Sequence, residues 1–363
     1  MSSTVSYPPR GAQPHADTNA IWIGVDRLID RASSTGDLRA HRLHLLAVAR
    51  YRSTGREVSA ELLEAARQAT LASFAAPLLL DHVRKVVDGP IILLKGPEVA
   101  ARYPTPALRP FGDLDLLVPD PIAAQRALIA AGFTLVGDEH LYREIHHLRP
   151  LHYRSYPLII EVHARPKWVE SGYGPTIDEL LEAAVPAAIG VDGILAPAPE
   201  HHTLLLAAHA WAHAPLGQLL QLIDIAALRA ESAPDELESL ARSWKLAQLW
   251  SLTDATADAL LLGGPKPWPL YVWAGQLRNV RRRTVLETHL ARWLPGFSVL
   301  PFRRACAASA RVIARDLKPA PGGTWRVRLR RTRRAVANAF VRRTEHDSEL
   351  AALEDPEHGR LRL

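Results

Sequence analysis

Apolar positions recur with a helical period toward both ends of the chain and form short runs in between. Residues 21–88 show apolar side chains at three- and four-residue spacing, with Ser59 as a candidate N-cap, which predicts an N-terminal helical segment. The same spacing returns at residues 199–262, a predicted helical domain. A Gly- and Pro-rich linker at 263–267 then precedes further predicted helices at 268–344.

The central segment, residues 89–198, contains short apolar runs bounded by turn residues, as expected for buried strands. Helical stretches near residues 98–103 and 122–131 separate some of these runs. The predicted strands are 91–94, 113–118, 133–136, 147–153 and 158–162. The mixture predicts an α+β fold, with a small mixed sheet, N-terminal helices against it and a helical C-terminal domain.

The two ends of the chain lack this periodicity. Residues 1–20 are rich in Pro, Ser and Gly and predict a disordered tail without the apolar core of a secretion signal, and residues 345–363 predict a polar tail. No apolar run reaches the roughly 18 residues expected of a membrane span. Cys306 is the single cysteine, so no disulfide forms within the chain. We therefore expect a cytoplasmic protein without a membrane span.

The net charge of +6 comes from one basic segment near the C-terminus. Residues 326–343 hold eight arginines, and no acidic residue falls between Asp316 and Glu345. This segment could bind RNA, an acidic membrane surface or an acidic partner. It also has a partial apolar stripe, formed by Leu329, Val336 and Phe340. The stripe favours the simpler interpretation of an amphipathic helix that packs on the domain.

Two carboxylates stand two positions apart on the predicted strand 113–118. Side chains at i and i+2 of a strand share a face and lie about 6.6 Å apart along its axis, so Asp113 and Asp115 can share divalent cations. The alternative is an edge strand with a solvated polar face. These residues alone give both interpretations equal weight.

Two further segments carry candidate chemistry. Lys95-Gly96 follows the apolar run at 91–94, where a glycine turn before a helix can receive phosphate; a plain strand-to-helix connection is the alternative. Glu161 and His163 share one face of the strand that begins at 158, so Glu161 can supply a third carboxylate or accept a proton; an ordinary strand end is the alternative.

These segments, in this order, resemble the uncharacterised nucleotidyltransferase family of the DNA polymerase β-like superfamily. The resemblance covers roughly residues 75–230. The matching segments are Lys95-Gly96, Arg109, Asp113-Leu114-Asp115, His147-Leu148-Arg149-Pro150-Leu151, Glu161-Val162-His163, His209 and Asp224-Ile225-Ala226.

The resemblance implies a role for each matched position. Asp113, Asp115 and Glu161 would be the catalytic, metal-binding carboxylates. Nucleotide phosphates would contact Lys95, Gly96 and Arg109. Possible pocket-wall residues are His163, His209 and Asp224. One departure concerns the turn, because Gly96 is followed by Pro97, which has neither an N–H nor a hydroxyl for phosphate.

The implied reaction moves a nucleoside monophosphate from an NTP to a hydroxyl acceptor and releases pyrophosphate. Two Mg²⁺ ions, or Mn²⁺ in their place, would be the cofactors. The acceptor could be a small molecule, a peptide or protein, or RNA, because the fold does not select among them. Two alternatives stay open: a non-catalytic NTP-binding or interaction protein, and an RNA-modifying transferase that uses the C-terminal arginines.

Overall fold

The computed structural model describes residues 16–137, 146–154, 156–168, 174–213, 215–319 and 324–342. The predicted tail at 345–363 lies outside these residues, as do residues 1–15 of the predicted N-terminal tail. The first helix, α1, begins at Ala16, so the prediction of disorder to residue 20 is wrong for its last five positions. Among the described residues, no helix combines the length and apolar character needed to cross a membrane.

The described residues form an α+β structure around one mixed sheet, as predicted. Its seven described strands run in the order β3-β4-β5-β2-β1-β7-β6. The strands are β1 Ile91–Leu93, β2 Asp113–Leu117, β3 Thr134–Leu135, β4 Leu151–His152, β5 Ile159–His163, β6 Val185–Pro186 and β7 Ile194–Ala196. The sequence pattern did not predict β6 and β7.

Strand β2 lies inside the sheet. It pairs with β1 in antiparallel and with β5 in parallel orientation. The alternative of an edge strand with a solvated polar face is therefore wrong. Alternation along β2 places Leu114 and Leu116 in the core on one side of the sheet, whereas Asp113, Asp115 and Leu117 point to the other side.

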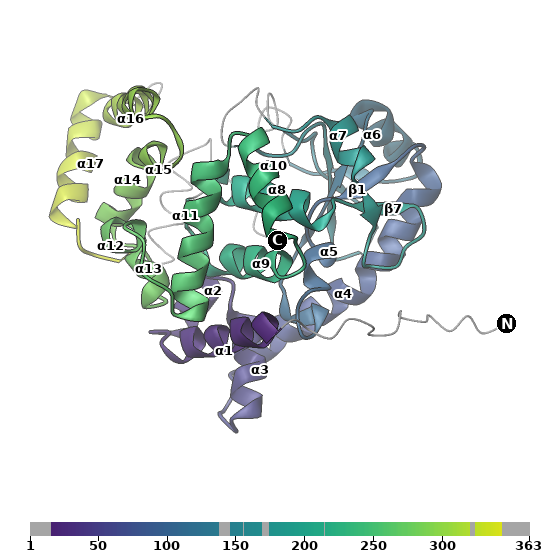
Figure 1. The fold of residues 1–363 in the computed structure, drawn as a ribbon, viewed down its shortest axis with the longest axis horizontal. Coiled ribbons are helices and arrows are strands. Elements are labelled where there is room, and N and C mark those ends of the chain that lie inside the picture. The colour runs from purple at the N-terminus through teal and green to yellow at the C-terminus, as the bar shows by residue number, and fades with distance from the viewer. Residues whose placement is uncertain are drawn as a thin grey trace.

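Helices cover both faces of the sheet (Figure 1). One face packs against α4 Ala60–Val86, which contributes Leu79, Leu80 and Val83 to that core. The other face meets the N-terminal helices and the helices that follow the sheet, and their apolar side chains form the second core. The first group is α1 Ala16–Asp30, α2 Thr35–Ala40 and α3 His44–Ser53.

The remaining helices lie in the predicted helical segments, except α7, which the pattern did not predict. Within the sheet region they are α5 Pro97–Ala100, α6 Pro121–Ala130 and α7 Ile177–Glu182. After it come α8 Pro199–His213, α9 Leu219–Arg229, α10 Pro234–Ser243 and α11 Ala247–Ala257, which continues into a π-helical turn, Asp258–Leu262. The last are α12 Pro269–Val272, α13 Gly275–Arg278, α14 Val285–Trp293, α15 Gly296–Val299, α16 Phe302–Leu317 and α17 Trp325–Ala337.

The arginine-rich segment is helical, but it does not pack as the sequence pattern predicted. Helix α17 has no buried residue. The side chains that were expected to pack on the domain, Leu329, Val336 and Phe340, are all exposed. The prediction of an apolar stripe facing inward is therefore wrong, because the helix contacts α14 through a different side.

Candidate active site

The pairing of β2 with β5 brings the candidate carboxylates together. The two strands run parallel, and Asp115 stands directly beside Glu161 in their register. His163, two residues further along β5, lies on the same face. Asp115 is fully buried, and its Oδ1 lies 3.0 Å from both Lys95 Nζ and His163 Nε2. The sheet thus places a carboxylate pair, an imidazole and an ammonium group in one cluster.

This cluster has the composition and spacing of a cation site. One candidate ligand atom from each of Asp115, Glu161 and His163 lies within 4.8 Å of the others. Both Asp115 carboxylate oxygens are buried without a well-aligned hydrogen bond from a described residue, although Lys95 and His163 stand at ion-pair distance. Buried carboxylate oxygens in this state favour a cation, so the residues fit a divalent metal ion.

Burial and neighbouring charges together shift the pKa values of the groups in this cluster. Burial alone would raise the pKa of Asp115, but Lys95 and His163 outweigh it and hold that pKa well below its usual range. Burial likewise opposes the charges of Lys95 and His163, yet the neighbouring carboxylates raise the pKa of both groups. Lys95 and His163 therefore favour the ionised form of Asp115.

Asp113 has the opposite environment. Burial and the nearby charge of Asp115 raise the pKa of the Asp113 carboxyl, and Lys95 only partly offsets these effects. Asp113 does not belong to the close group of ligand atoms; it lines the pocket beside that group. A half-buried carboxylate without full compensation is a second position at which cationic charge would be stabilising.

A pocket opens next to the carboxylates, between the sheet and the helices α8 and α9. Lys95, Gly96 and Asp113 line it from the sheet side. The other lining residues include Arg42, Arg109, His209, Gln218, Gln221 and Asp224. Three cationic side chains at the pocket suit a ligand that carries several negative charges.

Gly96 permits the close approach of the turn to β2. Its φ is 66°, in the left-handed region that favours glycine. A Cβ there would meet the Asp113 carbonyl oxygen at 3.0 Å. Pro97 follows as the first residue of α5, where its missing N–H leaves no helical hydrogen bond unmade. The turn is thus built for packing against the strand that carries both aspartates.

Arg109 is fixed by Asp224 on helix α9. Its Nε donates to Oδ1 at 2.8 Å and its Nη2 donates to Oδ2 at 2.7 Å. Tyr103 adds a hydrogen bond from its hydroxyl to the same Oδ1, at 2.7 Å. Arg109 Nη1 donates to the Gly96 carbonyl oxygen at 3.3 Å. This bidentate ion pair therefore ties the glycine turn to the helical domain.

Arg42 is a pocket cation that the sequence did not reveal. It follows α2 with a positive φ of 58°, and its Nη2 donates to the Pro110 carbonyl oxygen at 3.0 Å. Burial and the charge of Arg109 lower the pKa of its guanidinium group. Its placement in a pocket that also contains Asp113 makes it a candidate anion contact.

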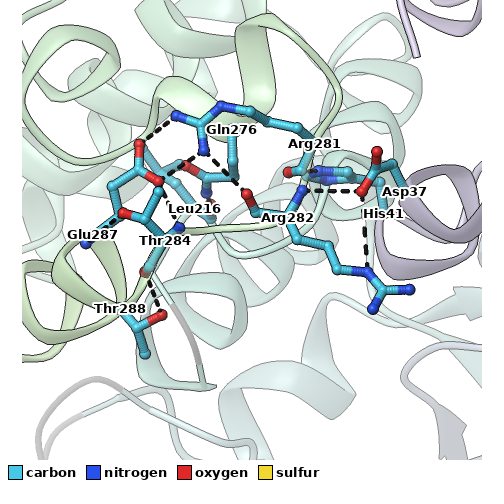
Figure 2. Close-up of polar contacts among 9 residues, drawn as sticks. All are labelled: Asp37, His41, Leu216, Gln276, Arg281, Arg282, Thr284, Glu287 and Thr288. Atoms are coloured by element: carbon cyan, nitrogen blue, oxygen red, sulfur yellow. Dashed lines mark hydrogen bonds and ion pairs between the residues drawn. The ribbon is translucent and has the colours of Figure 1, made fainter. Parts of the chain in front are cut away.

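The segment between α13 and α14 contacts Asp37 and His41, which lie just before Arg42 in the chain (Figure 2). His41 Nε2 lies 2.9 Å from the Arg281 carbonyl oxygen, and the Arg282 N–H donates to Asp37 Oδ1 at 3.1 Å. Glu287 in turn accepts two hydrogen bonds from the Arg281 guanidinium group. The segment between α13 and α14 therefore supports the pocket from outside.

Comparison with protein-family models shows to which family the chain belongs. The model for uncharacterised nucleotidyltransferases matches residues 37–262 of the chain, which include the described strands of the sheet and the helices from α3 to the π-helical turn. The chain belongs to this family. Family membership, expected from the motif order, is thus confirmed. No curated protein matches the chain, so the family gives the class of reaction without an acceptor.

The structure divides the sequence-predicted site residues into two adjoining groups. Asp115, Glu161 and His163 form the close cluster, with Lys95 against it and Asp113 beside it. The residues Gly96, Arg109, His209 and Asp224 line the pocket. His163 had been predicted only as a wall residue. The roles of all these residues stay predictions.

His147 is a further neighbour of the cluster that the sequence did not single out. Its Nε2 lies 3.6 Å from Glu161 Oε2, and a bridge between His147 and His163 places it beside β5. Burial lowers its pKa, so it is mainly neutral near pH 7. His147 is the first residue of the segment His147-Leu148-Arg149-Pro150-Leu151, which resembles the family, but nothing in the sequence indicated that it would lie beside Glu161.

A buried histidine beneath the Lys95 turn predicts loss of stability in acid. His202 Nε2 lies 2.6 Å from the Leu94 carbonyl oxygen, and burial lowers its pKa from 6.5 to about 3. The unfolded chain therefore binds a proton below pH 6.5 that the folded chain excludes. Unfolding free energy should fall by about 2 kcal/mol for this group between pH 7 and pH 5. Urea titrations across this range should show a smaller change in unfolding free energy with pH for His202→Gln than for the wild type. An equal change in the two proteins would contradict this role of His202.

Proposed function

We propose that this protein is a metal-dependent nucleotidyltransferase, which moves a nucleoside monophosphate from an NTP to a hydroxyl acceptor with release of pyrophosphate. One observation carries the proposal. Asp113 and Asp115 on β2 and Glu161 on the adjacent strand β5 meet beside a pocket with three cationic side chains. Carboxylates next to an anion-binding pocket are the arrangement that phosphoryl transfer requires.

The cluster would hold divalent cations through Asp115, Glu161 and His163, with Asp113 adjoining. We propose Mg²⁺ for the carboxylate oxygens, and the imidazole makes Mn²⁺ a good alternative. When bound, such ions screen the phosphate charge and lower the pKa of an acceptor hydroxyl. Lys95, which lies at ion-pair distance from Asp115, would then be free to contact the triphosphate.

The remaining roles follow from position. Lys95, Arg42 and Arg109 border the pocket and would neutralise the triphosphate. Arg109 keeps its orientation through Asp224 and so presents a fixed charge. Glu161 is the most accessible of the cluster's side chains, which suits it to accept the proton of the acceptor hydroxyl.

Direct transfer assays test the proposal. The purified protein is incubated with each NTP, labelled at the α-phosphate, with Mg²⁺ or Mn²⁺ and a cell extract as the source of acceptors. We expect metal-dependent pyrophosphate release together with label on one class of acceptor. Tight NTP binding with no transfer to any extract fraction would contradict catalysis and support a non-catalytic NTP-binding protein.

Arg42→Gln should weaken substrate binding. Removing one charge that faces the triphosphate is expected to raise the KM for NTP by about tenfold, because a charge-assisted hydrogen bond is worth roughly 1.5–3 kcal/mol. Steady-state kinetics give the value. Arg39→Gln is the matched control, since Arg39 lies on the neighbouring helix α2 and pairs with the exposed Glu61. An equal KM for NTP in both variants would show that Arg42 does not contact the bound NTP.

A further inference from the structure

Helix α17 presents an apolar stripe to solvent. With 3.6 residues per turn, Trp325, Leu329 and Val336 fall within roughly 40° of one another around the helix axis. Their exposed fractions are 67%, 53% and 71%. Phe340, in the turn after the helix, is 83% exposed. No described residue covers this stripe, because α17 contains no buried side chain.

The helix is nevertheless held in a defined orientation. Thr324 caps its N-terminus by accepting a hydrogen bond from the Val327 N–H. Beyond its C-terminus, the N–H groups of Val285 and Leu286 donate to the carbonyl oxygens of Val341 and Ala339 at 3.1 and 2.9 Å. These contacts dock the segment on the start of α14. The exposed stripe is therefore a fixed face of the fold.

Arginines flank the stripe on both sides. The thirteen residues of α17 include six arginines and no acidic residue. Around the axis, Arg326 and Arg333 border the stripe on one side and Arg328 borders it on the other, by the same helical geometry. Arg326, Arg330 and Arg333 are exposed. An exposed apolar stripe between arginine rows is the composition of a helix that lies in a membrane interface.

We propose that α17 is a docking surface for an anionic lipid membrane. Trp325, Leu329 and Val336 enter the headgroup region, and the arginines contact the acidic headgroups. RNA would also attract the arginines, but it offers no environment for the aliphatic side chains of Leu329 and Val336. Figure 1 shows α17 at the outer edge of the C-terminal helices, on the opposite side of the molecule from the sheet. Docking through α17 thus leaves the carboxylate cluster open to its substrates.

Vesicle sedimentation tests this surface with the full chain. We expect binding to equimolar phosphatidylcholine–phosphatidylglycerol vesicles to be roughly tenfold or more tighter than to phosphatidylcholine alone, and to weaken with salt. Two variant sets separate the contributions of the two side-chain types. The apolar set is Trp325→Ser, Leu329→Ser and Val336→Ser, and the basic set is Arg326→Gln, Arg330→Gln and Arg333→Gln. Each set should lower binding to the anionic vesicles at least tenfold.

A second exposed apolar stripe provides the matched control. Leu71, Phe74 and Leu78 on α4 are 63%, 68% and 62% exposed and lack surrounding arginine rows. Replacing these three residues by serine should leave vesicle binding unchanged. Circular dichroism and NTP binding should be the same for all variants, which shows that each still folds.

Three outcomes would overturn the proposal. One is equal binding of the wild type to neutral and anionic vesicles. Another is binding of an RNA hairpin that the basic set abolishes and the apolar set leaves intact, with no vesicle binding, which would make RNA the partner. The third is vesicle binding only after the acidic residues beyond Arg343 are neutralised, which would identify that segment as the occupant. The variant is Glu345→Gln, Asp347→Asn, Glu349→Gln, Glu354→Gln, Asp355→Asn and Glu357→Gln.

Discussion

Replacing either Asp113 or Asp115 by asparagine is expected to lower nucleotidyl transfer by about 10³-fold or more. An amide keeps the shape of each side chain but removes the negative charge that a divalent cation requires. A loss of this size corresponds to about 4 kcal/mol of transition-state stabilisation. Initial rates of pyrophosphate release, measured at saturating NTP and metal, give the comparison.

The two variants should differ in stability although they share the loss of activity. Burial and Asp115 raise the pKa of Asp113, so folding without a bound cation destabilises its ionised form relative to the unfolded chain. Asp113→Asn should therefore increase the free energy of unfolding. The pKa of Asp115 is held low by Lys95 and His163, so Asp115→Asn should decrease it. Urea titrations in the presence of a chelator measure both changes.

A control and a contrary result make this test specific. Asp120 follows the same strand but caps helix α6 through the Ala123 N–H, away from the cluster. Asp120→Asn should keep its transfer activity. Wild-type turnover in Asp113→Asn would show that the second aspartate alone carries the metal chemistry. A rise in stability for Asp115→Asn would contradict the ion pairs described for it.

The strand that carries both aspartates was predictable because two independent signals agree there. Period-two alternation places Leu114 and Leu116 on one face and the carboxylates on the other, which the core confirms. The order of the surrounding motifs gave the family, which the family model confirms. What the local pattern could not decide was whether the polar face met solvent. That depends on β5 and β1 on either side, which are non-local pairings.

Other parts of the site depend on tertiary contacts that no periodic pattern in the sequence indicates. Arg42 reaches the pocket from a positive-φ turn, and in a chain with many arginines nothing in the sequence distinguishes it. His163 was assigned to the pocket wall, because its 3.0 Å approach to Asp115 arises only from the parallel register. The outward stripe of α17 was misjudged for a related reason. Amphipathic periodicity shows that a helix has two faces but not which one packs.

Asp224→Asn should be the most destabilising single change among the pocket residues. Asp224 and Arg109 are both buried and share two hydrogen bonds, and Tyr103 donates a third to the same carboxylate. Loss of the carboxylate charge leaves the Arg109 guanidinium buried without a full counter-charge. Breaking such a pair costs about 3–5 kcal/mol. Urea midpoints at pH 7 should show this loss without a change in the denaturant slope.

Two comparisons separate this ion pair from general charge loss. Glu64→Gln removes the acidic partner of an exposed pair with Arg67, and it should cost less than about 1 kcal/mol. The double variant Arg109→Met/Asp224→Leu should recover much of the stability lost by Asp224→Asn, because no uncompensated charge is left in the interior. It should not recover transfer activity, since the guanidinium group that anchors the Gly96 turn is gone. Recovery of activity together with stability would mean that Arg109 serves only the packing of the sheet against helix α9.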